Sequence, residues 1–440
     1  MIAAVLLSLA IPCLVPAAAI PAGGEPGGAA HPAPDARPAP DAESVRALVT
    51  SIAPAVEEIR GLRFKKPVAV EMADDAAARG HFEERMRAEW PESRIEIEQE
   101  AYIDLGLLPA RTGLKACVLD ALEEQAAGYY DPGRDAFFVL GDMPRSIASF
   151  IVAHELTHAL DDQYFDIDGM LEKTGGDDGR AGGVAAVVEG SGTLVMTIYI
   201  VQEIGSGRLT SDAAREYQES EVGQAKRLKA TPQIVQRLLV GPYVLGMYFL
   251  LKGNLAALPR VAAPKGDLER AFRDPPVSWE QVLHPEKYWN EEARDLPRPV
   301  AIPDLSSTLG EGWALQGEGG FGEMVLAILT DPGAEALDPT SFQDPQRWTN
   351  AGAAGWGGDR WQLYRRGDDT VTVLATLWDS DRDAREFRAA LPRSTGRAIR
   401  RRRDAVVLVT GEAGDRARAL AREALRAVGR VAGSLRARRS

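Results

Sequence analysis

Two histidines and a glutamate within residues 151–163 have the spacing of a metal-binding helix. His154 and His158 are four residues apart, so on a helix both imidazoles project from one face and can bind one metal ion. Glu155 lies one position along, where its carboxylate can take a proton from a water on that metal. The chain has five histidines, and chance predicts only about 0.005 such HExxH motifs in it. The motif therefore predicts metal binding rather than two core histidines bonded to carbonyl groups.

A tetrahedral zinc site of this type needs a third protein ligand, because its last position is kept for water. The predicted ligand is Glu189, the only charged residue in the run 181–202. A carboxylate buried in an apolar helix costs much free energy unless it is paired or bound to a metal. The alternatives for Glu189 are a pair with a buried arginine and a helix cap. Asp161 and Asp162 are rival ligands, although Asp162 suits a role in orienting the imidazole of His158.

With these residues the chain resembles the gluzincins, the thermolysin-like branch of the HExxH metallopeptidases. The resemblance rests on residues 154–158 and on Glu189, and it departs at Thr193, where gluzincins commonly have an aspartate. The chain is also similar to secreted bacterial HExxH proteins that share HALxDQ from the second histidine onward. That likeness covers most of residues 44–390 and implies no substrate. The resemblance implies a zincin-like domain in which residues 136–140 form a strand that lines the cleft and pairs with the substrate; a plain core strand is the alternative.

The resulting hypothesis is an exported zinc metallopeptidase that hydrolyses peptide or protein substrates. His154, His158 and Glu189 would bind Zn²⁺. Glu155 would act as the general base on a zinc-activated water and then protonate the leaving amine. Two other functions remain open: an envelope binding or scaffold protein with a structural or relic metal site, and a zinc amidase that acts on cell-wall material.

We expect a residue that stabilises the oxyanion of the transition state within residues 274–288, a segment with little apolar periodicity. His284 or Tyr288 could donate a hydrogen bond opposite the metal, and we include both among the predicted catalytic residues. Tyr243 is a weaker rival. The alternative for His284 is a turn histidine with no catalytic role.

Composition and the N-terminal residues predict export. The net charge of -13 argues against a nucleic-acid binder. Residues 1–19 read as a signal peptide, with an uncleaved anchor or a lipoprotein at Cys13 as alternatives. The mature chain then has one cysteine, Cys117, and therefore no disulfide within the chain. We expect a periplasmic, envelope or extracellular protein with no stable membrane span after cleavage; the oligomeric state is left open.

The apolar periodicity predicts an α+β protein of two folded domains. A Pro/Ala-rich linker at residues 20–43 precedes a mostly helical catalytic domain at 44–345, and a C-terminal α+β domain follows at 346–440. In the last domain the order strand, strand, helix occurs twice, which predicts a four-stranded sheet packed under two helices. The other expected elements are helices at 44–59, 75–90, 114–127 and 238–251, and a strand at 67–72.

Overall fold

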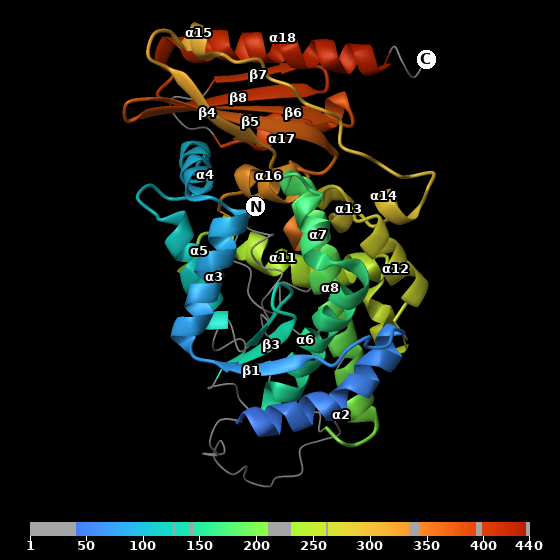
Figure 1. Ribbon diagram of the computed structural model, residues 1–440. Helices are drawn as coiled ribbons and strands as arrows, with labels where there is room; N and C mark the ends of the chain where they lie inside the picture. The colour runs from blue at the N-terminus through green and yellow to red at the C-terminus, as the bar shows by residue number, and fades with distance from the viewer. Residues whose placement is uncertain are drawn as a thin grey trace, which may run out of the picture.

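The computed structural model of the protein describes residues 41–125, 128–140, 145–209, 230–260, 263–333, 344–392 and 398–436 (Figure 1). The predicted signal peptide and residues 20–40 of the predicted linker lie outside these ranges. Within them the protein is α+β, as predicted, with a largely helical part and two sheets.

The N-terminal helices near residues 44, 75 and 114 and the strand near residue 69 follow the prediction, whereas the helix Glu92–Leu105 was not predicted and Gly128–Asp131 is a strand where a turn was expected. Helix α2 (Ala42–Arg60) begins after Asp41, whose side chain accepts a hydrogen bond from the Ser44 N–H at 2.8 Å. It ends at Gly61, which adopts a left-handed conformation with φ of 79°. The elements that follow are β1 (Ala69–Ala73), α3 (Asp75–Glu89), α4 (Glu92–Leu105), α5 (Leu114–Gln125), β2 (Gly128–Asp131) and β3 (Ala136–Leu140).

Strands β1, β3 and β2 form a small sheet in that order, with β3 in the centre. Strand β3 pairs with β1 in parallel and with β2 antiparallel, and all five of its residues are buried. A substrate backbone can only be added to a free sheet edge, because a central strand already uses its N–H and C=O groups on both sides. The prediction that residues 136–140 pair with the substrate is therefore wrong, and β3 is a core strand.

The metal-motif helix lies next to the longest helix of the described chain. These helices are α6 (Arg145–Phe165) and α8 (Asp178–Gly205), joined by the short α7 (Ile167–Glu172). By length and composition, α8 could cross a membrane, but 94% of its most apolar window is buried inside the protein. Such burial is typical of a core helix. Helix α11 (Gln233–Leu250), the predicted apolar helix, packs along α8.

Glycines bring α8 and α11 into close contact. A Cβ atom on Gly246 would lie 2.0 Å from the carbonyl oxygen of Ala186, and a Cβ on Gly190 would lie 2.4 Å from the carbonyl carbon of Gly246. No side chain fits at either position without separating the helices. The contact also fixes how Tyr243, one turn before Gly246, faces the part of α8 that contains Glu189.

The segment between α11 and the C-terminal sheet connects the two parts of the protein through Lys287. Its ammonium group lies 2.6 Å from Glu280 and 3.0 Å from both Asp295 and Asp379, and Asp379 directly follows a strand of the C-terminal sheet. The lysine thus balances part of the charge of three carboxylates. The helices of this segment are α12 (Lys265–Arg273), α13 (Trp279–Leu283), α14 (Glu286–Trp289), α15 (Ser306–Leu309) and α16 (Gly322–Thr330).

The C-terminal sheet is antiparallel, with strand order β4-β5-β6-β8-β7. The predicted order strand, strand, helix occurs twice, but a fifth strand, β4, joins the edge from upstream of residue 346. The elements are β4 (Ala314–Gly319), β5 (Trp356–Arg366), β6 (Asp369–Trp378), α17 (Asp381–Ala390), β7 (Ala398–Arg402), β8 (Ala405–Gly411) and α18 (Ala417–Arg436).

The two helices of this domain cover opposite faces of the sheet, and not one face as predicted (Figure 1). Helix α18 packs on the outer face, where Val373 and Val407 join its buried residues in one apolar cluster. On the other face, Phe387 of α17 stacks on Trp378 at 4.6 Å between ring centroids. This inner face belongs to the same apolar core as the helical part. The arrangement follows from strands whose side chains are buried on both faces.

Candidate metal centre

His154, His158 and Glu189 meet in the interior, between α6 and α8. The Nε2 atoms of the two histidines lie 2.8 Å apart, and each lies 3.2 Å from Oε2 of Glu189. Each of the three residues is at most 1% exposed. The three atoms are close enough together to bind one metal ion. The structure therefore brings together the three residues that the sequence predicts as ligands.

The chemistry of this group fits a divalent cation. Two imidazole nitrogens and one carboxylate are donors that zinc prefers. Oε1 of Glu189 is buried and has no hydrogen-bond partner in the structure, and the same is true of Nδ1 of His154 and of His158. Leaving a buried polar atom without a partner costs about 1–3 kcal/mol. A cation at the group would contribute the attraction that compensates part of this cost.

Burial sets the protonation of these side chains in the direction that a metal requires. It lowers the pKa of His158 to about 4, and burial together with the neighbouring His158 lowers the pKa of His154. Both imidazoles are therefore neutral at pH 7, which is the form that binds a metal. Burial raises the pKa of Glu189 to about 7, against hydrogen bonds from His154 and Tyr243 that lower it. A bound cation would favour the ionised carboxylate.

Glu155 lies beside the three ligands with one carboxylate oxygen held and the other without a partner. Its Oε2 accepts a hydrogen bond from the backbone N–H of Tyr130 at 2.6 Å, and its Oε1 is buried with no hydrogen-bond partner. Burial and the nearby charge of Glu189 raise the pKa of Glu155 well above its usual range. The donor Tyr130 belongs to β2, an edge strand of the small sheet. The sequence marks residues 128–132 only as a turn, so it gave no sign of this contact.

Asp162 does not orient the imidazole of His158, and this expectation is wrong. Its carboxylate accepts hydrogen bonds from the Tyr130 hydroxyl at 3.0 Å and from the Ile167 N–H at 2.9 Å. These contacts fix the turn into α7 and the edge strand. A spacing of four residues places Asp162 and His158 on one helix face, but the side chain of Asp162 bonds to neighbours outside the helix.

Asp161 is not a ligand either, because its two oxygens are already bound. Oδ1 accepts from Nε of Arg60 and Oδ2 from the hydroxyl of Ser191, both at 2.7 Å. The pair of Arg60 and Asp161 is fully buried. Since Ser191 is on α8 and Arg60 ends α2, this carboxylate fixes three helices around the metal centre. Nothing in the spacing of these residues along the sequence predicts the contact.

The structure places His284 and Tyr288 in other contacts. Nε2 of His284 lies 3.0 Å from both carboxylate oxygens of Glu323, and the hydroxyl of Tyr288 donates to the carbonyl oxygen of Asp274 at 2.6 Å. In the part of the chain that the structure describes, neither side chain has a hydrogen bond to the ligand group. The two predicted oxyanion donors are thus not brought together with the metal ligands.

Tyr243, and not His284 or Tyr288, lies next to the three proposed metal ligands. Its ring is fully buried and lies parallel to the imidazole of His154, with 5.9 Å between centroids. Its side chain also forms a hydrogen bond with Glu189, which lowers the pKa of that carboxyl. From the sequence, Tyr243 is a weaker candidate than His284, because a tyrosine in an apolar run gives no signal of its own. Its position depends on the close contact of α8 with α11.

Gly192 leaves the space that His154 occupies, and this gives a prediction. A Cβ atom on Gly192 would lie 2.7 Å from Cε1 of His154. We expect Gly192→Ala to displace the imidazole and to weaken binding of a divalent cation, measured with zinc, by about 10-fold to 100-fold, the size of loss seen when a ligand is poorly oriented. Competition with a chelator measures the affinity.

The matched control is Gly205→Ala, because a Cβ atom there would meet nothing within 4 Å. Both changes replace glycine with alanine in α8, but Gly192 lies in its interior and Gly205 is its last residue, so helix propensity by itself favours Gly192→Ala and cannot explain a loss of affinity in that variant. We expect Gly205→Ala to bind zinc as the unchanged protein does. Equal affinities for the two variants would contradict the close packing of His154 against α8.

Comparisons with known proteins identify a family model for the C-terminal sheet only. Residues 314–432 match the model described as a domain of unknown function (DUF8575). The match begins at the first residue of β4 and ends within α18, so it covers the five-stranded sheet and both of its helices. No curated protein and no solved structure matches the chain.

Proposed function

We propose that this protein is an exported zinc-dependent metallopeptidase with a zincin-like catalytic part. The observation that supports the proposal most strongly is the buried group of His154, His158 and Glu189 beside Glu155, which has one carboxylate oxygen free. A site that only stabilises a fold has no need of such a base next to its ligands.

In this proposal the chain's residues hold the metal and move the proton. When bound, the metal supplies a Lewis acid that polarises the scissile carbonyl and makes water more acidic. The Tyr130 N–H fixes one oxygen of Glu155. A bound cation would favour the ionised carboxylate against the burial that raises its pKa, and the free Oε1 would then take the proton of the attacking water. Glu155 then delivers that proton to the leaving amine. Tyr243 replaces His284 and Tyr288 as the proposed donor to the developing oxyanion, because it is buried against His154.

We propose β2 as the strand that pairs with an extended substrate. Strand β2 is an edge of the three-stranded sheet, and the Tyr130 N–H on its outer side reaches Glu155. The four residues of β2 are buried and the Tyr130 N–H is already bonded to Glu155, so a peptide could be added at this edge only if the covering segments move; it would then run past the proposed base. This assignment replaces that of β3, whose two edges are both paired.

The proposal is tested by digesting a peptide library with the zinc-loaded protein and identifying products by mass spectrometry. We expect cleavage that stops with a chelator and returns with zinc. Peptidoglycan fragments are digested in parallel. Cleavage of the fragments alone would favour the zinc amidase, and no cleavage of either by a folded, zinc-loaded protein would contradict a hydrolase.

One observation favours a second candidate, an envelope binding or scaffold protein whose metal is structural. The ligands and Glu155 are each at most 1% exposed, so a substrate reaches them only if the surrounding segments move. A structural site predicts that chelation lowers the unfolding temperature while no substrate is hydrolysed. Thermal unfolding with and without chelator, beside the digestion above, separates the two functions.

The pKa of Glu189 predicts how zinc affinity depends on pH. Because this pKa is raised to about 7, zinc must displace one proton from Glu189 below pH 7. The imidazole of His158, with a pKa near 4, holds no proton to displace above pH 5. We expect the affinity to rise about tenfold per pH unit from pH 5 to 7 and to level off above it. Chelator competition across this range measures the slope, and an affinity independent of pH would contradict the assignment of Glu189.

A further inference from the structure

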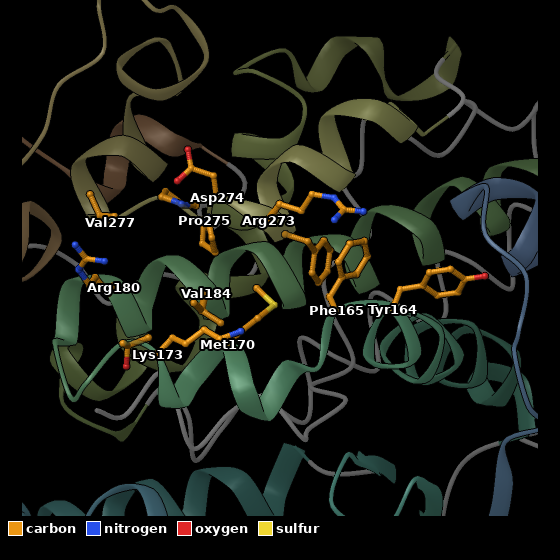
Figure 2. A pocket seen from close by; sticks show the side chains of 13 residues that line it. Tyr164, Phe165, Met170, Lys173, Arg180, Val184, Arg273, Asp274, Pro275 and Val277 are labelled. Carbon is orange, nitrogen blue, oxygen red and sulfur yellow. The ribbon is translucent and has the colours of Figure 1, made fainter.

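A concave site lies at one end of α6 and α8, the two helices that hold the proposed metal ligands. It is a pocket of about 580 Å³, lined by the end of α6, by α7, by the start of α8 and by the segment that follows α12 (Figure 2). Pockets that bind small molecules have volumes of about 300–1,000 Å³. None of the residues that line it is a proposed metal ligand, so its chemistry is independent of the metal centre.

The floor of the pocket is apolar and aromatic. Phe165 and Phe272 stack with 4.6 Å between their ring centroids, and Met170 and Val184 are buried beside them. The guanidinium of Arg60 lies against both rings, at 5.7 and 5.3 Å from the centroids. The stack is thus held in place from the protein side. Because Phe272 is buried, the half-buried ring of Phe165 is the part of the stack that offers a rigid surface to an apolar group.

The rim is cationic, although the whole chain has a net charge of -13. Lys173, Arg180 and Arg273 line the pocket and are exposed, and none of the three forms an ion pair with an acid in the described residues. Figure 2 shows Lys173 and Arg180 toward one end of the pocket. The one carboxylate in the lining, Asp274, is paired with Arg294 at 2.9 Å. An anion in the pocket would therefore meet three cations that form no ion pair among the described residues, although the guanidinium of Arg273 already lies over the Phe165 ring, 5.8 Å from its centroid.

From this combination we infer that the pocket binds a small amphiphilic carboxylate. Its apolar group would lie on the Phe165–Phe272 stack, and its carboxylate would meet the guanidinium of Arg180 and the ammonium of Lys173. Two sources share this chemistry: an apolar residue at the C-terminus of a peptide, and a fatty acid. The inference does not rest on the proposed function, because it involves neither zinc nor hydrolysis.

Isothermal titration of the full chain tests the inference with four probes. N-acetyl-phenylalanine and octanoate represent the two sources. N-acetyl-phenylalaninamide keeps the ring and lacks the charge, and acetate keeps the charge and lacks the apolar group. We expect one or both of the amphiphilic acids to bind at least about tenfold more tightly than the amide and acetate. An amide that binds as tightly as its acid, or no binding of either acid, would overturn the inference.

Two double variants test whether the acid binds in this pocket. Changing Lys173 and Arg180 together to Gln is expected to weaken binding of the acid about tenfold or more. The control changes Lys115 and Arg382 to Gln, which removes the same two charges from α5 and α17. Lys173, Arg180 and Arg382 are exposed, whereas Lys115 is half-buried. Each control residue also loses an ion pair, with Glu92 and Glu386 respectively, so circular dichroism checks that both variants fold. Binding that is unchanged in the first variant but lost on chelation would assign the acid to the metal centre and overturn the inference.

Discussion

Replacing Glu155 with Gln is expected to lower the rate of hydrolysis by about 100-fold to 10,000-fold, the range that general acid–base catalysis contributes. The amide has nearly the same shape and can still accept the hydrogen bond from the Tyr130 N–H, but it cannot take a proton from water. The ligands are unchanged, so the variant should keep about one zinc per chain. In the unchanged protein the carboxyl of Glu155 lies near the charge of Glu189, and this charge raises the pKa of Glu155. Glu155→Gln removes that unfavourable interaction between two carboxyl groups. We therefore expect no loss of stability.

The measurements are kcat/KM on a peptide found in the library digest, zinc by elemental analysis and thermal unfolding. Glu58→Gln is the matched control, since Glu58 is an exposed residue of α2. It should hydrolyse the peptide at the unchanged rate. Full turnover by Glu155→Gln would exclude Glu155 as the base. If Glu155→Gln instead loses both its activity and its zinc, the proposed ligand set must be revised, and not the proposed base.

Removing the third ligand should have the other large effect. In Glu189→Ala we expect zinc affinity to fall by at least about 100-fold, because even loss of a residue that only orients a ligand costs up to that amount. The two buried imidazoles then lose the one carboxylate among the described residues with which they form hydrogen bonds or ion pairs. The zinc content of the purified variant should be far below that of the unchanged protein.

Thermal unfolding supplies a second measure of the same loss. At a free zinc concentration of 1,000 times Kd, binding stabilises a folded protein by about 4 kcal/mol. Chelation should therefore lower the unfolding temperature of the unchanged protein but not that of Glu189→Ala. Thr193→Ala is the control, because Thr193 lies one turn further along α8 with a buried hydroxyl that has no partner. If the unchanged protein is folded but binds no zinc, the proposed metal centre is contradicted.

The sequence alone was sufficient for the local chemistry. Residues four apart on a helix share a face wherever that helix lies, so the pairing of His154 with His158 needs no tertiary information. Glu189 could be predicted because a single charge in a buried helix needs a partner, and the structure supplies one. The helices and strands at the two ends of the described chain follow from caps, apolar periodicity and alternation, which are also local properties.

The tertiary structure decided everything that depends on contacts between distant segments. Asp161 and Asp162 are neighbours in sequence, yet one binds Arg60 and the other Tyr130, as the packing of α2 and β2 against α6 dictates. The pairing of β3 on both sides could not be read from its own residues, because β1 precedes it by more than sixty residues. Tyr243 reaches Glu189 only because Gly190 and Gly246 let two helices approach. Spacing along the chain determines which side chains share an element, whereas the approach of elements depends on the shapes of both surfaces.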